Sequence, residues 1–208
     1  MSPNLTAKGA ATRQRIVELA APVFNTRGFV GASMRDLADA TGLEKGGIYN
    51  HFGSKEQLAL EAYDHAMSLV TDALARSQRP TDDAIERLQA MARSFAVSAR
   101  NPVIDGGCPI MNTAIEADDT HPELRDRARV SMTSWHRLIG RIVKDGVAAG
   151  TIDPDSDPYE LASVLTSALE GGLMLARLYD DPTRMDHVIA HVSAYVETLR
   201  VRPEEATT

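Results

Sequence analysis

Residues 33–52 constrain the fold of this chain more than any other stretch, because their pattern predicts two short helices joined by a tight turn. Ser33 is a favourable N-cap, and Asp36, three residues later, completes a capping-box pattern. Gly42 interrupts the first apolar run, as expected of a residue that can adopt the positive φ at a helix end. Ile48 supplies the apolar side chain that would hold the second helix against the first. This spacing predicts a helix-turn-helix.

The second of these helices would be packed on one side only. Its other side carries small and polar residues that a protein core does not need, which favours contact with a DNA major groove over an ordinary helical hairpin. Lys45, Tyr49 and Lys55 are expected to contact phosphates, and the alternative for Tyr49 is a core aromatic. Asn50 and His51 are expected to reach bases or the opposite backbone. The full set of predicted DNA-binding residues is Ser33, Arg35, Lys45, Gly46, Gly47, Tyr49, Asn50, His51 and Lys55.

Charge is distributed unevenly along the chain. The 208 residues carry a net charge of −7, which by itself argues against a nucleic-acid partner. Through Lys55, however, seven Lys or Arg stand against four Asp or Glu, a net charge of +3, while the remainder has fifteen against twenty-five, a net charge of −10. A basic head on an acidic body is the distribution expected when only one end of a protein meets a polyanion.

Other features of the composition limit the class of protein. One cysteine excludes an internal disulfide and a thiolate cluster for zinc, and it favours a reducing cytoplasm. The sequence shows no apolar run of the roughly 18 residues that a membrane span needs, so no membrane partner is expected.

Helical periodicity continues through the rest of the chain, and no segment alternates with the period of two that is typical of strands. Pro22 predicts a kink in the first helix. Besides the two helices of the helix-turn-helix, the predicted helices cover residues 13–25, 55–77, 82–100, 110–117, 120–149, 157–179 and 181–199. The predicted fold is therefore all-α with about nine helices. A three-helix head would form a DNA-binding domain over residues 1–56, and residues 57–208 would form a ligand-binding and dimerisation domain.

Several short motifs stand together between residues 10 and 60: Arg13-x-Arg15-Ile16, Arg27-Gly28-Phe29, Met34-Arg35-Asp36-Leu37-Ala38, Gly42-Leu43, Gly46-Gly47-Ile48-Tyr49-Asn50-His51-Phe52 and Ser54-Lys55-Glu56. Together they resemble the transcriptional regulators of the tetracycline-repressor (TetR) family. Gly47 departs from the Thr, Ser or Ala more usual there, and Asn50 stands where the family often has an aromatic residue or His. Further on, Gly106-Gly107-Cys108-Pro109-Ile110 with Asn112 and Glu116 is similar to one branch of the family's C-terminal domains, which implies a homodimer and a ligand cavity.

Aromatic and methionine residues of the body could line a pocket for a small apolar or aromatic ligand, and the alternative is that they form plain core. Nearby polar side chains favour a pocket, since a ligand site needs a few convergent polar groups. The predicted ligand-binding residues are Phe95, Met111, Asn112, Ile115, Glu116, Trp135, His136, Ile139, Leu169 and Met174.

The last two long helices are predicted to form a four-helix dimer interface. Gly171-Gly172 would permit close approach of the partner, because glycine in a helix costs about 1 kcal/mol and so indicates a packing reason. The alternative is that these glycines admit a neighbour within one subunit. The predicted interface residues are Leu161, Leu165, Ala168, Gly172, Leu175, Val188, Val192 and Tyr195.

Cys108 offers two other classes of function. With His121 or His136 it could form a nucleophile pair, but no orienting third group is evident, so the chain is not expected to be an enzyme. It could also sense oxidants or electrophiles at a helix N-terminus, or be merely structural. His187 and His191 lack evident partners, so neither a metal nor a cofactor is expected.

The sequence thus predicts a cytoplasmic, ligand-responsive regulator, most simply a repressor. It would bind a palindromic double-stranded DNA operator as a homodimer and be released by a small-molecule inducer. A helical enzyme or small-ligand carrier is the alternative class, although the basic head would then have no role.

Overall fold

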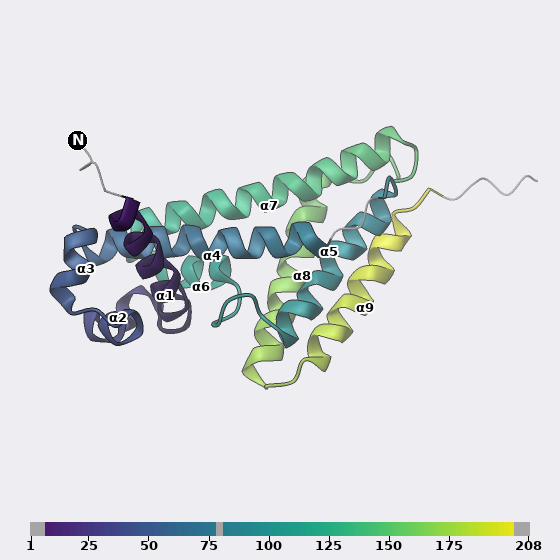
Figure 1. The fold of residues 1–208 in the computed structure, drawn as a ribbon. Helices are drawn as coiled ribbons and strands as arrows, with labels where there is room; N and C mark the ends of the chain where they lie inside the picture. Colours follow the sequence, from purple (N-terminus) through teal and green to yellow (C-terminus); the bar gives the residue numbers. More distant parts are fainter. Residues whose placement is uncertain (1–6, 78–80, 202–208) are drawn as a thin grey trace, which may run out of the picture. The chain divides into compact units, whose positions relative to one another are not determined.

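A computed structural model describes residues 7–77 and 81–201, and all nine of the elements named within these ranges are α-helices (Figure 1). The prediction of an all-α fold is confirmed. The helices are α1 (Ala7–Gly31), α2 (Met34–Thr41), α3 (Lys45–His51), α4 (Lys55–Ser77), α5 (Ala84–Arg100), α6 (Pro109–Ala117), α7 (Pro122–Ala148), α8 (Pro158–Leu178) and α9 (Thr183–Thr198).

The chain divides into two compact units. The first unit comprises Met1–Asp72 and Val103–Ser131, and the second comprises Ala73–Pro102 and Met132–Thr208. Their boundary does not coincide with the predicted domain boundary after Glu56. The reason is that α6, the start of α7 and the greater part of α4, as far as Asp72, all pack with the head.

The core of the first unit explains this division. Ile16 and Ala20 of α1 pack with Leu37 of α2 and Ile48 of α3, and the cluster also takes in Leu58 of α4. These side chains are almost fully buried. Because α4 closes the core of the head, its first half cannot be separated from the helix-turn-helix without exposing apolar surface.

Helix α1 is interrupted near its end. Gly28 has φ 72° and ψ 171°, and it is the residue within Ala7–Gly31 whose backbone angles are non-helical. The change of direction predicted at Pro22 thus lies at Gly28 instead, since a glycine, which has no Cβ, adopts this positive φ without strain. Beyond it, the Ser33 hydroxyl accepts the amide of Asp36 at 3.2 Å, and the Asp36 carboxylate accepts the amide of Ser33 at 2.8 Å, which confirms the predicted capping box.

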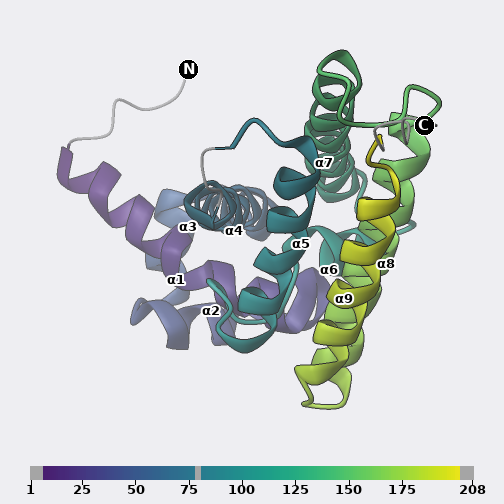
Figure 2. The same cartoon turned by 90° about the vertical axis from the view of Figure 1, so that its right-hand side faces the viewer.

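The second unit has α5, α8 and α9 side by side (Figure 2). By length and apolar content α8 could cross a membrane. Its apolar side chains are instead explained by the core, because Leu161, Leu165, Leu169 and Leu173 are all buried within this unit.

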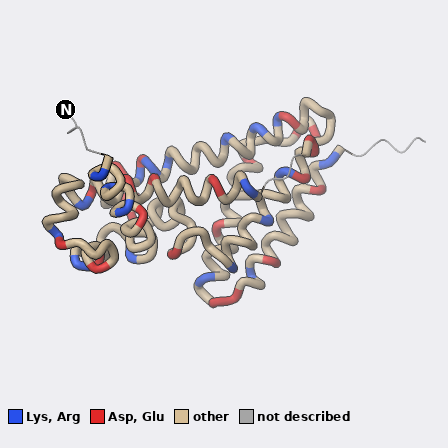
Figure 3. The backbone as a smooth tube through the Cα atoms, in the orientation of Figure 1, with Lys and Arg blue, Asp and Glu red and all other residues tan. Residues whose placement is uncertain are grey.

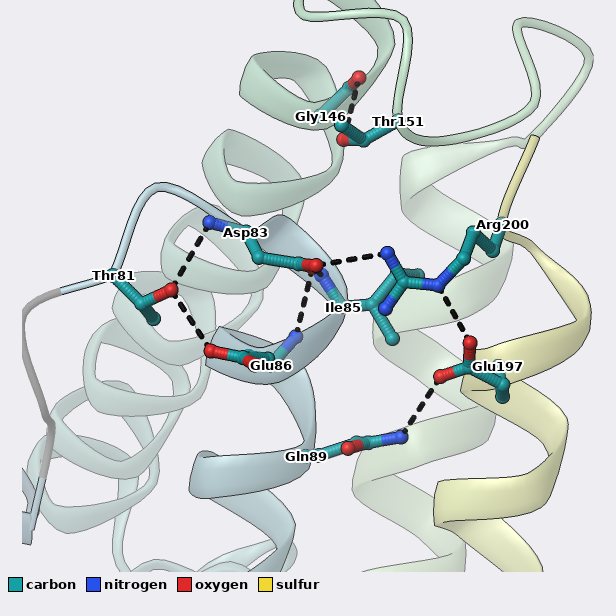
Figure 4. Close-up of polar contacts among 9 residues, drawn as sticks. All are labelled: Thr81, Asp83, Ile85, Glu86, Gln89, Gly146, Thr151, Glu197 and Arg200. Atoms are coloured by element: carbon teal, nitrogen blue, oxygen red, sulfur yellow. Dashed lines mark hydrogen bonds and ion pairs between the residues drawn. The ribbon is translucent and has the colours of Figure 1, made fainter. Parts of the chain in front are cut away.

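An ion-pair network joins the start of α5 to the end of α9 (Figure 4). The Arg200 guanidinium lies 2.8 Å from the Asp83 carboxylate and also binds Glu197, which in turn accepts the Gln89 amide at 3.3 Å. Burial would raise the pKa of Asp83, but hydrogen bonds from Arg200 and the Glu86 amide hold it below the usual range of an aspartate. The pKa of Asp83 is therefore lower in the folded state than in the unfolded state. The network stabilises the fold at pH values above the unfolded pKa, and this stabilisation is lost as the pH falls through the folded pKa.

Candidate nucleic-acid interface

The two short helices of the head pack through one face of α3. Gly42 ends α2 with φ 69°, and its amide donates to the Ala38 carbonyl at 2.9 Å. This left-handed turn redirects the chain into α3, where Ile48 is 1% exposed while Tyr49, the next residue, is 46% exposed. Asn50 is exposed beside it. Helix α3 is therefore buried on one side and open on the other, as the sequence predicted.

Two glycines lie on or beside the open side of α3. A Cβ added at Gly46 would have no atom within 4 Å outside the helix's own backbone, and one at Gly47 would meet only Leu43, at 3.7 Å. The fold therefore leaves room for a side chain at both positions. Each glycine costs the helix about 1 kcal/mol relative to alanine, and packing within the described residues does not require either of them.

Basic residues are distributed over α1, α2 and α3 (Figure 3). Arg35 and Lys45 are exposed, and neither forms an ion pair within the described part of the chain. Arg13 behaves differently, because its guanidinium binds the His51 carbonyl and the Glu61 carboxylate and lies 4.0 Å from the centre of the Phe52 ring. Arg13 thus joins α1 to the end of α3.

Two of the predicted DNA contacts already have partners inside the chain. The Ser33 hydroxyl takes part in the capping box, where it also donates to the Asp36 carboxylate at 2.7 Å. These bonds, and to a lesser extent the nearby Arg27, hold the pKa of Asp36 below the usual range of an aspartate. The Lys55 ammonium donates to the Phe29 carbonyl and lies 4.5 Å from the centre of the Phe29 ring. It can direct its remaining N–H bonds elsewhere, since an ammonium carries three donors.

Side chains of α6 form hydrogen bonds with the backbone at the end of α1. These bonds, made by Glu116 and Asn112, are here named the α1–α6 contact. The Glu116 carboxylate accepts the amides of Phe29 at 2.8 Å and Val30 at 2.9 Å. The Asn112 amide donates to the Asn25 carbonyl at 3.1 Å and to the Gly106 carbonyl at 2.9 Å. These two polar residues, predicted as ligand groups, thus fix the position from which the chain enters α2.

A cavity of about 360 Å³ adjoins this contact, with walls from α1, α4, α6 and the start of α7. Among the predicted ligand residues, Asn112, Ile115 and Glu116 line it. Met111 also belongs to the first unit. The remaining predicted ligand residues, which lie in the second unit and do not line this cavity, are Phe95, Trp135, His136, Ile139, Leu169 and Met174. The sequence had placed all ten in one pocket.

Two family models match the chain. The model described as bacterial regulatory proteins, tetR family, matches residues 16–62, and the model described as tetracyclin repressor-like, C-terminal domain, matches residues 84–192. The second match alone covers more than half of the sequence. The chain belongs to the TetR family of transcriptional regulators.

Relatives of known sequence and structure agree with this assignment. The HTH-type transcriptional regulator Rv0196 of Mycobacterium tuberculosis is 30% identical over 183 residues, which are 85% of this chain and 89% of that protein. The HTH-type transcriptional repressor DhaR of Mycobacterium sp. strain GP1 is 26% identical over 86% of this chain and 89% of its own length. A TetR transcriptional regulator from Chloroflexus aurantiacus is 41% identical, with a TM-score of 0.91 over 95% of this chain and 100% of that one.

The predicted dimer residues of this TetR-family chain fall into two groups. Leu161, Leu165, Gly172 and Val192 are buried inside the second unit, whereas Ala168, Leu175, Val188 and Tyr195 are half-buried. A Cβ at Gly172 would lie 3.0 Å from Val188 and 3.1 Å from Met185, both in α9 of the same chain. The close approach that the sequence indicated at this glycine therefore occurs within one subunit.

Cys108 and His121, considered above as a possible nucleophile pair, each lie at the start of a different helix. Cys108 is the half-buried N-cap of α6. The Nδ1 atom of His121 accepts the Leu124 amide at 3.2 Å, so this histidine caps the start of α7. No group of three or more His, Cys, Asp or Glu suited to a metal ion occurs in residues 7–77 and 81–201.

Sequence reasoning missed two structural roles in the head. Arg13 entered only through the family resemblance, although its position on α1 made contact with α3 possible. Asn25 was not singled out, yet its side-chain amide donates to the Asp105 carbonyl at 2.7 Å and to the Gly107 carbonyl at 3.1 Å. The pair of glycines at 106 and 107 was the available signal that a backbone approaches there closely.

Proposed function

We propose that this TetR-family regulator is a repressor that binds a palindromic operator as a homodimer and is released by a small-molecule inducer. The observation that carries the DNA-binding part is the one-sided packing of α3. Ile48 is buried against the head, while Lys45, Tyr49 and Asn50 are exposed on a surface that no other described residue of the first unit covers. A short helix exposed in this way fits a major groove, and its small residues allow the helix backbone to approach the bases.

Lys45 and Lys55 are proposed to contact phosphates. Lys45 is the first residue of α3. Lys55 is the first residue of α4, where the helix amides favour an anion. Arg35 and the Tyr49 hydroxyl supply further donors. Asn50 is the side chain proposed to read a base, and His51 lies next to it at the end of the helix.

Selection of bound sequences from random duplex DNA, followed by salt titration, tests this proposal. Lys45→Ala and Lys55→Ala are each expected to reduce the slope of log affinity against log salt by about 0.9, because each removes one phosphate contact. Lys55→Ala should also lower the stability of the head, since its bond to the Phe29 carbonyl is lost. Lys45→Ala should leave stability unchanged and serves as the control. An unchanged salt slope in both variants, or the absence of any selected sequence, would contradict the proposal.

An apolar strip on α8 supports the homodimer. Val164, Met174 and Leu178 are 45%, 45% and 70% exposed, and their spacing places them on one face of the helix. Gly171 lies on the same face, and a Cβ there would have nothing within 4 Å outside the helix's own backbone. A two-fold interface presents the same patch from both subunits, so this strip can cover its own copy. Ala168 and Leu175 border it.

Charge placed on this strip is expected to separate the subunits. Val164→Asp would bury two carboxylates at a two-fold interface, so sedimentation velocity should show a monomer at protein concentrations where the unmodified chain is a dimer. The matched control is Val97→Asp on α5, where the valine is 61% exposed and association should persist. Equal behaviour of the two variants would place the interface elsewhere. Gly172→Leu is not a suitable test, because it would collide with Val188 of its own chain.

The inducer is proposed to be a small apolar or aromatic molecule held in the second unit. The rings of Phe95 and Trp135 meet edge to face there, with their centres 5.9 Å apart. Trp135 is the single tryptophan of the sequence, so its emission reports directly on a ligand at this position. A ligand would release DNA to the extent that it binds the DNA-free conformation more tightly than the DNA-bound one.

A further inference from the structure

The cavity beside the α1–α6 contact has the size and composition of a ligand site. Its volume of about 360 Å³ lies within the range of small-molecule sites, about 300 to 1,000 Å³. Phe24, Phe29 and Tyr63 contribute aromatic rings, and Ile115 lies at its rim with 70% of its surface exposed. The cavity lies wholly within the first unit. Phe95 and Trp135, proposed to meet the inducer, are not among the residues that line it.

A carboxylate without a cationic partner distinguishes this cavity. Both oxygens of Glu116 accept backbone amides, and no Lys, Arg or His of the described ranges forms an ion pair with them. Arg27 also lines the cavity, but its guanidinium is paired with Asp36. The Asn112 amide is likewise directed elsewhere, to the Asn25 and Gly106 carbonyls. The Glu116 carboxylate is thus held by the backbone amides of Phe29 and Val30 and not by an ion pair within the described ranges.

The aromatic walls of the cavity, like the Glu116 carboxylate, favour a positively charged ligand. The faces of aromatic rings attract cations, and this attraction grows when water is excluded. Lys55 already lies over the Phe29 ring, which shows that a cation is accommodated at this aromatic cluster. Phe24 and Tyr63 remain as walls for a second one. A planar cation with two N–H donors would match the two oxygens of Glu116 as well as the rings.

We propose that this cavity binds a small organic cation carrying N–H donors, such as an amidine or a guanidine, with Glu116 as its counter-ion. The cation competes with the amides of Phe29 and Val30 for the same two oxygens. Those amides lie in the segment that leads into α2, so binding loosens the connection between α6 and the helix-turn-helix. The effect of the cation on DNA rests on the proposed function, whereas the binding site itself does not.

Benzamidine provides the probe, and isothermal titration calorimetry of the full chain provides the measurement. Saturable binding of one benzamidine per chain is expected. Glu116→Gln should weaken it by about tenfold or more, because a charge-assisted pair is lost. Glu18→Gln, on the exposed side of α1, is the matched control and should leave binding unchanged. Neutral benzamide, which has the same shape, should bind about tenfold more weakly or not at all.

A second variant keeps the test valid if Glu116→Gln disturbs the fold. Thr113→Trp fills the cavity from α6 while leaving the carboxylate in place, and it should abolish benzamidine binding. The amide NMR signals of Phe29 and Val30 should shift on titration of the unmodified chain. The proposal is overturned by the absence of saturable binding, by equal affinity for benzamide, or by unaltered binding in both variants. Calorimetry needs no DNA, so failure of the site is distinguishable from failure of the DNA-binding function.

Discussion

Gly106→Ala is expected to lower the free energy of unfolding by about 3 kcal/mol or more. Gly106 has φ 106°, which an L-residue with a Cβ rarely adopts. A Cβ there would also lie 2.4 Å from the Asn25 carbonyl oxygen, and that atom belongs to the backbone of α1. Neither group can move without breaking the bonds that Asn112 and Asn25 make across the α1–α6 contact.

Gly42→Ala is the matched control for this prediction. Gly42 also has a positive φ, 69°, but a Cβ there would meet no atom within 4 Å. It should therefore cost only the left-handed backbone penalty, about 1 to 2 kcal/mol. Urea denaturation of both variants, followed by circular dichroism, gives the comparison. If the two substitutions cost the same, the approach of the 106–107 loop to Asn25 is looser than the structure indicates.

Helix positions in this chain could be predicted because their determinants are local. The Ser33 and Asp36 pair forms both bonds of its capping box, and Asp157, at the start of the helix predicted over residues 157–179, accepts the Tyr159 amide at 2.8 Å. Each of these signals involves residues within one turn of the helix end, so no tertiary information is required. The one-sided burial of α3 followed from periodicity for the same reason.

Polar residues of α6 could not be assigned from sequence. Asn112 and Glu116 lie on a helix with apolar neighbours, which is equally consistent with ligand binding and with bonds to another segment. The partners of Glu116 are backbone amides of Phe29 and Val30, and every residue except proline carries such an amide. Nothing in the side chains of residues 29 and 30 could therefore reveal the contact, which depends on the break of α1 at Gly28.

The glycines of α8 illustrate the same limit. Gly171 and Gly172 are adjacent, and the sequence predicted close approach of a partner subunit at the pair, with a neighbour within one subunit as the alternative. The structure separates them, since Gly172 meets α9 of its own chain and Gly171 faces open space. Successive residues on a helix point about 100° apart, so one neighbour can face the core and the other a partner. Which of the two does so depends on where α9 lies.

Arg13→Ala is expected to weaken both the head and its binding to DNA. The substitution removes a hydrogen bond to the His51 carbonyl, an ion pair with Glu61 and a cation–π contact with Phe52, at a combined cost of about 2 to 3 kcal/mol in unfolding free energy. Helix α3 has seven residues, so it depends on such tertiary contacts for its orientation. Operator affinity should fall about tenfold or more if the end of α3 loses about 1.4 kcal/mol of its restraint.

Arg15→Ala separates this positioning role from a general loss of charge. Arg15 lies on the same helix, is exposed, and forms no ion pair within the described ranges, so its removal changes the net charge equally without releasing α3. Thermal denaturation and a gel-shift titration at several salt concentrations compare the variants. Arg13→Ala should lower affinity while keeping the salt slope of the unmodified chain, because Arg13 acts through His51 and Phe52 and not on a phosphate. Arg13→Lys should recover only part of the loss, since an ammonium lacks the planar fork that reaches the carbonyl and the carboxylate together. A reduced salt slope in Arg13→Ala would instead make this arginine a direct DNA contact, and equal affinity of the two alanine variants would remove its positioning role.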